Sequence, residues 1–146
     1  MSDERSRELE RLVAYFEHLT RADVARIGEF YTEDASFKDP FNEVRGHAAL
    51  RRVFDHMFDQ VHDPRFVIHE AIGQGDQAFL VWDFIFRMKR FDAATTRTVR
   101  GSSHLRFAAD GRLRAHRDYW DAAEELYEKL PLVGALMRWL KRKAVP

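Results

Sequence analysis

The chain has 146 residues, in which 24 basic residues balance 24 acidic ones, and it has no cysteine. This length suits one domain, and the balanced charge provides no field that would attract nucleic acid. The lack of cysteine excludes disulfides, thiolate nucleophiles and zinc-thiolate sites. The N-terminus is charged and no apolar run approaches the length of a membrane span, so we expect a cytoplasmic protein.

Apolar residues recur at steps of three and four in the first part of the chain, which predicts amphipathic helices. The predicted helices cover about 4–20, 23–31 and 47–61. Asp23 is placed to cap the second helix, and the His-Asp-Pro sequence at 62–64 is expected to end the third. Tyr15 lies beside the apolar stripe of the first helix, while Phe54 and Phe58 belong to the stripe of the third.

After Pro64 the pattern changes to the alternating or continuous apolar runs that are typical of strands. The predicted strands cover 65–72, 77–91, 96–107 and 111–120, with a short strand at 35–39 before the third helix. Four successive strands joined by short turns indicate an antiparallel meander. Helices that precede an antiparallel sheet predict an α+β fold, in which the sheet curls over the helices.

A helical tail is predicted from about residue 121, where Asp121 and Glu124 resemble a capping box. After Pro131 the apolar residues gather on one side of a second helical segment: Leu132, Val133, Leu136, Met137 and Leu140. Cations follow at its C-terminal end. The segment is either a membrane-surface or lid helix, or a helix docked on its own domain or a partner subunit. We expect docking and no membrane partner.

The predicted strand at 77–91 is apolar on both faces. One face carries Ala78, Leu80, Trp82, Phe84, Phe86 and Met88, and the other Phe79, Val81, Asp83, Ile85 and Arg87. An antiparallel sheet with one wet side would not show this pattern. We therefore expect a homodimer in which the outer sheet face covers the same face of a second copy.

The last predicted strand places His116, Asp118 and Trp120 on one face. His116 and Asp118 are two residues apart, roughly 7 Å along a strand, so each can influence the protonation of the other. Such a buried cluster is either a paired structural group or a functional one. The seven histidines do not predict a metal site, since His56 and His62 are spaced too far apart for one helical face.

Three stretches carry a resemblance to a known family. They are YFEHLTRADVARIGEFYTEDASFKDP, RGHAALRRVF and SHLRFAADGRLRAHRDYW. Together with the order of elements they resemble the nuclear transport factor 2-like superfamily, in particular its SnoaL-like and ketosteroid-isomerase-like branches, over about 12–120. The resemblance implies a cone in which a curved antiparallel sheet wraps around N-terminal helices, here with an extra C-terminal helix. It says more about architecture than about chemistry.

Ketosteroid isomerases use an Asp base with a Tyr and a protonated Asp as hydrogen-bond donors. The resemblance places the base on Asp39, in the Asp-Pro pair, and the donor on Tyr15. The second donor falls on Ser103, whose hydroxyl is a weaker donor than a carboxylic acid. Asp39 can equally be a turn residue, because Asp-Pro is also an ordinary turn signal.

Asp83, His116 and Asp118 add polar groups to the expected pocket, where a ketosteroid isomerase is mostly apolar. In this respect the chain resembles the SnoaL-like polyketide cyclases, whose acid/base is a carboxylate deep in the pocket, and the candidate is Asp118. Such a cyclase needs no metal or organic cofactor. Limonene epoxide hydrolases share the fold but use an Asp, Arg, Asp relay around a water, which the sequence does not place.

Three functions follow as hypotheses, of which the third is a membrane-surface protein that acts through the Arg-Trp-Leu-Lys-Arg-Lys sequence at 138–143. The first is an isomerase or cyclase that acts on a small apolar carbonyl compound, with Asp39 or Asp118 as base, Tyr15 as donor and His116 beside them. The second is a non-catalytic module for ligand binding or dimerisation. In the first two, the expected ligand-lining residues are Ser103, Asp83, Trp120, Phe54 and Phe58.

Overall fold

The computed structural model describes residues 2–127 and 131–146, the side chains of 131 and 132 excepted. The helices are α1 (Asp3–Glu17), η1 (Arg21–Glu29, a 3-10 helix), α2 (His47–Gln60), α3 (Ala122–Glu125) and α4 (Pro131–Ala144). The strands are β1 (Tyr31–Lys38), β2 (Glu43–Arg45), β3 (Val61–Gln74), β4 (Gln77–Met88), β5 (Thr96–Phe107) and β6 (Leu113–Tyr119). The predicted α+β class is confirmed.

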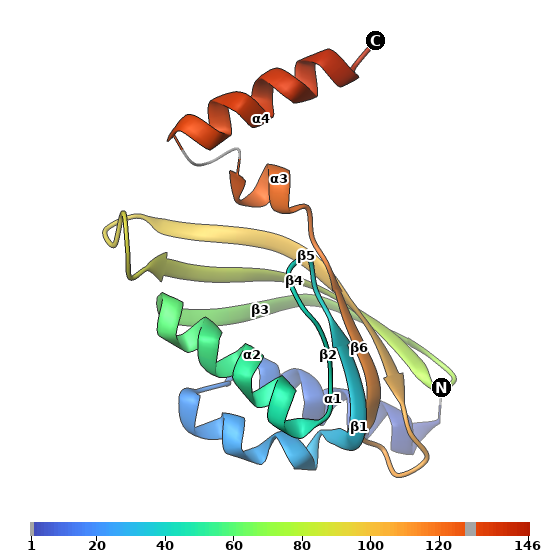
Figure 1. Cartoon of the computed structure of the whole chain (residues 1–146). Coiled ribbons are helices and arrows are strands. Elements are labelled where there is room, and N and C mark those ends of the chain that lie inside the picture. Colours follow the sequence, from blue (N-terminus) through green and yellow to red (C-terminus); the bar gives the residue numbers. More distant parts are fainter. Residues whose placement is uncertain (1, 128–130) are drawn as a thin grey trace.

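All six strands form one sheet in the order β2-β1-β6-β5-β4-β3. The last four make the predicted antiparallel meander, and β1 joins it by pairing parallel to β6. The sheet is strongly curved, and α1, η1 and α2 lie on its hollow side (Figure 1). Ile27, Leu50, Leu80 and Leu105 are fully buried between these layers, so the core lies between the helices and the sheet.

The His-Asp-Pro sequence follows the end of α2 at Gln60, as predicted. The predicted start of the next strand at residue 65 was wrong, because β3 already begins at Val61 and includes this sequence where the register shifts between His62 and Arg65. Pro64 is tolerated there because β3 is an edge strand. Asp23 is not the N-cap residue of η1, because Thr20 occupies that position. The Asp23 carboxylate accepts a hydrogen bond from the backbone N–H of Thr20 at 2.9 Å, as in a capping box.

The two faces of β4 differ as the alternation predicted. Leu80 and Trp82 are buried on the hollow side, whereas Phe79 and Val81 on the outer side are 42% and 39% exposed. The outer side is therefore apolar and only partly covered within one chain. A homodimer through this face stays a prediction.

The C-terminal segment begins with Asp121, which caps α3 by accepting bonds from the backbone N–H groups of Ala123 and Glu124. Beyond it, α4 stands off the sheet at the top of Figure 1, and its apolar residues Leu136 and Leu140 are exposed. Docking of this helix on its own domain is therefore not observed, and docking on a partner subunit stays a prediction. Within the described part of the chain, no helix is both long and apolar enough to cross a membrane.

Candidate functional site

A chain of hydrogen bonds crosses the hollow side of the sheet and joins five side chains. The Tyr31 hydroxyl lies 2.7 Å from His116 Nδ1, and His116 Nε2 lies 2.6 Å from Asp118 Oδ1. Ser103 Oγ donates to the same Oδ1 at 2.5 Å, and Trp82 Nε1 donates to Ser103 Oγ at 2.8 Å. We call this set of residues, Tyr31, His116, Asp118, Ser103 and Trp82, the buried relay.

Strand register explains why these residues meet. His116 and Asp118 point to the hollow side because they alternate along β6, and Ser103 of β5 stands directly opposite Asp118. Trp82 of β4 stands opposite Gly101, where a Cβ would lie only 2.5 Å from the indole atom Cη2. The glycine therefore leaves room for the Trp82 ring beside β5, where its indole N–H reaches Ser103.

The positions of the protons in the buried relay follow from the Tyr31 hydroxyl, because Tyr31 is 0% exposed. Burial, with a smaller contribution from the nearby Asp118 charge, raises the pKa of Tyr31 well above its usual range, so the phenol keeps its proton. We assign this proton to the bond to Nδ1, which leaves the imidazole proton on Nε2, where it is donated to Asp118. Asp118 Oδ1 thus receives two hydrogen bonds.

Asp118 lies between a small inner cavity and a larger outer hollow. The inner cavity has a volume of about 30 Å³, enough for a water molecule. It is lined by Phe16, Phe54, Phe66, Ile68, Leu80, Trp82, Ser103, His116 and Asp118. The His116 side chain is 5% exposed and that of Asp118 18%, so the carboxylate is the more accessible end of the pair.

The outer hollow has a volume of about 600 Å³ and is open to solvent. It is lined by Lys38, Asp39, Pro40, Arg117, Asp118, Tyr119, Trp120 and Asp121. Both predicted catalytic carboxylates, Asp39 and Asp118, thus line the same hollow, together with the predicted ligand residue Trp120. Phe41 meets the Trp120 ring edge to face at 5.5 Å.

Asp39 itself is engaged in the turn between β1 and β2. Its Oδ1 accepts bonds from the backbone N–H groups of Phe41 and Asn42 at 2.8 and 2.7 Å, and the Asn42 amide group bonds to both carboxylate oxygens at 3.1 Å. These bonds are those of an aspartate that closes a turn on its own backbone. The turn interpretation of Asp39 therefore has direct support, whereas its role as a base stays a prediction.

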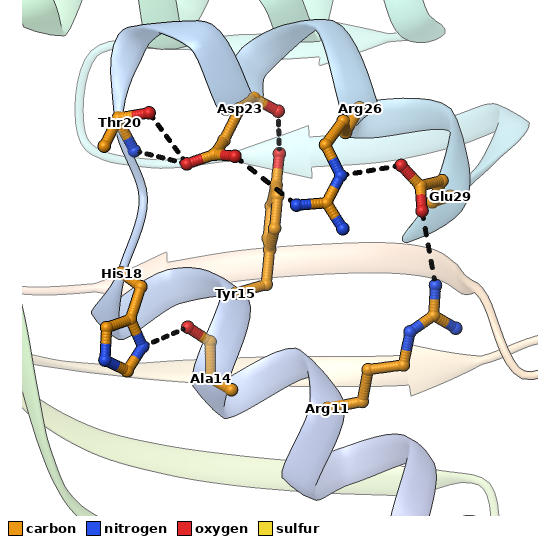
Figure 2. A network of polar contacts seen from close by, with 8 residues as sticks. All are labelled: Arg11, Ala14, Tyr15, His18, Thr20, Asp23, Arg26 and Glu29. Atoms are coloured by element: carbon orange, nitrogen blue, oxygen red, sulfur yellow. Dashed lines mark hydrogen bonds and ion pairs between the residues drawn. The ribbon is translucent and has the colours of Figure 1, made fainter.

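Tyr15 lies away from both the cavity and the hollow. Its hydroxyl donates to the backbone carbonyl of Asp23 at 2.7 Å (Figure 2). Its ring stacks on Phe30. Burial is the main cause that raises its pKa to about 12. Around it, Arg26 bridges Asp23 and Glu29 at 3.4 and 2.8 Å. The structure thus uses the Tyr15 donor to tie α1 to η1 and does not bring it to Asp118.

Two further predicted ligand residues lie elsewhere. Asp83 points to the outer face of β4, where it pairs with His69 at 3.0 Å and Arg100 at 4.0 Å. Its alternation with Trp82 already excludes it from the hollow side. Phe58 is buried under the Arg21 guanidinium, outside the cavity lining, whereas Phe54 does line the cavity.

Sequence reasoning missed Tyr31 and Trp82 as members of the site. Tyr31 was assigned to the end of a helix, but it is the first residue of β1. The signal for Trp82 was present, because its alternation placed it on the buried face. Within the residues that the structure describes, no group of three or more His, Asp or Glu side chains could hold a metal ion.

Comparisons with known proteins agree on the architecture. The family model for the SnoaL-like domain matches residues 12–116. No curated protein matches the sequence at a significant level.

Similar solved structures include a Catenulispora acidiphila protein with a ketosteroid isomerase-like fold in complex with trimethylamine. It has 16% identity and a TM-score of 0.70, and the match covers 86% of this chain and 92% of that one. AclR of Streptomyces galilaeus, a proposed hydroxylase, has 20% identity and a TM-score of 0.69 over 88% and 98% of the two chains. A proposed SnoaL-like polyketide cyclase from Shewanella denitrificans has 17% identity and a TM-score of 0.67 over 86% and 98%. At these identities the likeness shows the fold.

Proposed function

The chain belongs to the SnoaL-like domain family, and on that premise we propose that it is an isomerase or cyclase that needs no cofactor. Its substrate would be a small carbonyl compound, and Asp118 would be the general acid/base. The observation that carries this proposal is the buried relay, which holds a carboxylate between an apolar cavity and an open hollow. Carboxylates held in such surroundings are suited to proton transfer.

In this proposal, Asp118 removes a proton from a carbon next to the substrate carbonyl, which gives an enolate and a neutral carboxyl group. In an isomerisation the carboxyl group returns the proton to another carbon. In a cyclisation the enolate carbon attacks a second carbonyl and forms a carbon–carbon bond, and the carboxyl group then protonates the new alkoxide. Either way the proton balance closes on Asp118 alone.

The other members of the relay position this carboxylate. His116 and Ser103 both donate to Oδ1, which fixes the plane of the carboxyl group. Within the described residues Oδ2 accepts no hydrogen bond and is the oxygen we assign to proton transfer. Tyr31 fixes the imidazole by its bond to Nδ1. Their role is positioning, because a rigid catalytic group needs support from its neighbours.

The relay also narrows the substrate class. The hydroxyl of Ser103 and the indole N–H of Trp82 are already engaged, and the Tyr15 donor is elsewhere, so these donors do not serve an oxyanion. A substrate whose enolate is delocalised over a second carbonyl or an aromatic ring needs such donors least. The outer hollow has the volume of a small-molecule pocket, and Trp120 offers it an aromatic wall.

Binding without turnover is the second candidate function. The inner cavity favours it, since this space of about 30 Å³ holds no more than about a water molecule. A ligand would then remain in the outer hollow, and the relay would serve only to satisfy buried polar groups.

Deuterium exchange separates the two functions without knowledge of the natural substrate. We would incubate the protein in D₂O with a panel of aryl ketones and 1,3-diketones and follow deuterium incorporation by mass spectrometry. If the proposal is right, some compounds exchange faster than in buffer, and Asp118→Asn slows this exchange by about two to four orders of magnitude. The amide oxygen of the variant would still accept the bonds from Ser103 and His116, so the fold should survive.

Asp83→Asn is the matched control, because it makes the same change on the outer face and should keep the wild-type rate. If Asp39→Asn abolished exchange and Asp118→Asn did not, the assignment of the base to Asp118 would be wrong. If the compounds bound but none exchanged faster than in buffer, the second candidate function would replace the first.

A further inference from the structure

The charge of the chain is divided unevenly between α4 and the rest. Residues 131–146 contain four cations, Arg138, Lys141, Arg142 and Lys143, and no acidic residue. The remaining 130 residues therefore carry 20 basic and 24 acidic residues, although the whole chain is neutral. The C-terminal helix is thus the cationic end of the protein, and an anionic surface would attract it in particular.

The helix is also strongly two-sided. Val133, Leu136, Met137 and Leu140 follow each other at steps of three, one and three, which places them on one side of α4. By the same helical period, Arg138 and Arg142 fall on the opposite side and Lys141 falls on its flank. Near the end of the helix, the Lys143 amine lies 5.8 Å from the centre of the Trp139 ring. An apolar side, a cationic side and a tryptophan between them are the features of helices that lie in a membrane interface.

The apolar side of α4 is left uncovered by the rest of the chain. Val133, Leu136, Trp139 and Leu140 are between 42% and 52% exposed. Figure 1 shows the helix standing off the sheet, joined to the body through α3. Contiguous exposed apolar side chains on an otherwise folded protein mark an interaction surface.

We propose that α4 binds reversibly in the plane of an anionic lipid membrane. Its 14 residues are about 21 Å long, shorter than the hydrocarbon core of about 30 Å, so the helix lies on the membrane and does not span it. The apolar side enters the acyl boundary, and the cations contact lipid phosphates. The concentration of all four cations in a segment without acids favours this occupant over the apolar face of a second copy.

This placement would affect the hollow near Asp118. Trp120 and Asp121 line the hollow and lead directly into α3, which precedes α4. A membrane-bound α4 therefore holds the hollow close to the bilayer, where apolar small molecules concentrate. The membrane inference does not depend on the proposed chemistry, and its test measures lipid binding alone.

Co-sedimentation with sucrose-loaded vesicles tests the inference on the full chain. One set of vesicles contains phosphatidylcholine alone, and the other also contains phosphatidylglycerol. We expect binding to the anionic vesicles that weakens with added salt, and much weaker binding to the neutral ones. The double variant Arg142→Gln/Lys143→Gln should bind the anionic vesicles about 30-fold more weakly, because each cation near such a surface contributes about fivefold.

Two single variants test the apolar side at equal charge. Ala135→Glu adds one negative charge on the cationic side and should weaken binding about fivefold. Leu136→Glu adds the same charge on the apolar side and should weaken binding at least a further tenfold, because it also removes a buried leucine from the acyl boundary. Both changes lie on a helix that stands off the body, so the melting temperature should stay at the wild-type value.

Three results would overturn the inference: no binding to anionic vesicles, equally strong binding to neutral ones, or equal losses for Ala135→Glu and Leu136→Glu. Analytical ultracentrifugation without lipid identifies the main competing occupant. If the wild type self-associates through α4, Leu136→Glu gives a smaller species, and the absence of vesicle binding then assigns the helix to a second copy.

Discussion

Tyr15 and Tyr31 both bury a phenol ring in the core, but their hydroxyl groups meet different partners. Tyr15 donates to the backbone carbonyl of Asp23, whereas Tyr31 contacts His116. Burial raises the pKa of both phenols, to about 12 for Tyr15 and well above the usual range for Tyr31. The Tyr15 hydroxyl thus ends on a backbone carbonyl, whereas the Tyr31 hydroxyl joins a chain of side chains that leads through His116 to the Asp118 carboxylate.

The surroundings of the two tyrosines differ as well. The Tyr15 network continues into Arg26, Asp23 and Glu29, whose ion pairs lie at the surface (Figure 2). Exposed pairs of this kind contribute little to stability. The Tyr31 network is enclosed, and a polar group left without a partner there loses its hydrogen bond without regaining water. Removal of the same chemical group should therefore lower the free energy of unfolding more in the Tyr31 network than in the Tyr15 network.

The largest effect is expected from His116→Ala. This change leaves the Tyr31 hydroxyl without its acceptor, removes one donor from Asp118, and opens a cavity beside Phe37, whose ring centre is 4.9 Å from that of His116. We expect the free energy of unfolding to fall by about 3 kcal/mol or more, measured by urea denaturation at neutral pH.

The matched control is His104→Ala, on the outer face of β5. His104 stacks on Phe79 and bonds to Gln77, but it is only partly buried. We expect a loss below about 1 kcal/mol. If the two variants lost comparable free energy of unfolding, the buried relay would be no more sensitive to the loss of a side chain than the sheet surface.

A smaller and more direct test removes one hydroxyl from each region. Tyr31→Phe leaves His116 Nδ1 as a buried acceptor without a donor, and should cost about 1–3 kcal/mol. Tyr15→Phe frees a backbone carbonyl beside an open hollow at the η1 surface, where water can replace the phenol, so the cost should be about 0.5 kcal/mol. Chemical denaturation of both variants measures the two losses in the free energy of unfolding. A larger loss for Tyr15→Phe than for Tyr31→Phe would contradict the comparison.

Strand alternation was the sequence pattern that best predicted which residues form the site. It placed Ser103, His116 and Asp118 on one side of the sheet, and the structure brings these three side chains into direct contact. The limits predicted for β5, 96–107, also agree with the structure. Period-two patterns are local and therefore readable in a single chain.

Contacts that depend on distant pairing could not be predicted. Tyr31 reaches His116 only because β1 lies parallel to β6, with an irregular register between Tyr31 and Ser36. No local period encodes such a pairing, and the apolar stripe of the preceding segment made Tyr31 resemble a helical residue. Asp39 shows the opposite case, because the turn signal in its own sequence agrees with its bonds to Phe41 and Asn42. The role as a base, which the resemblance to ketosteroid isomerases implies, stays a prediction.

The smallest effect concerns acid stability and belongs to the Tyr15 network. Hydrogen bonds from Thr20 lower the pKa of Asp23, and the bond from Arg26 lowers the pKa of Glu29. A carboxylate whose pKa is lower in the folded state stabilises the fold above its unfolded pKa, which is about 4. This contribution is lost as the pH falls through the folded value.

Arg26→Gln removes the main cause for Glu29 and a lesser one for Asp23, so its stability at neutral pH should be slightly below that of the wild type. The two proteins should converge as the pH falls from about 5 towards about 2, because both carboxylates are then protonated in either protein. Thermal melts across this range measure the difference, with the exposed Arg52→Gln on α2 as a control for net charge. A gap that stayed constant with pH would show that Arg26 stabilises η1 by packing on Tyr15 and Phe30, whose ring centres lie 6.0 and 5.8 Å from its guanidinium carbon, and not through its charge.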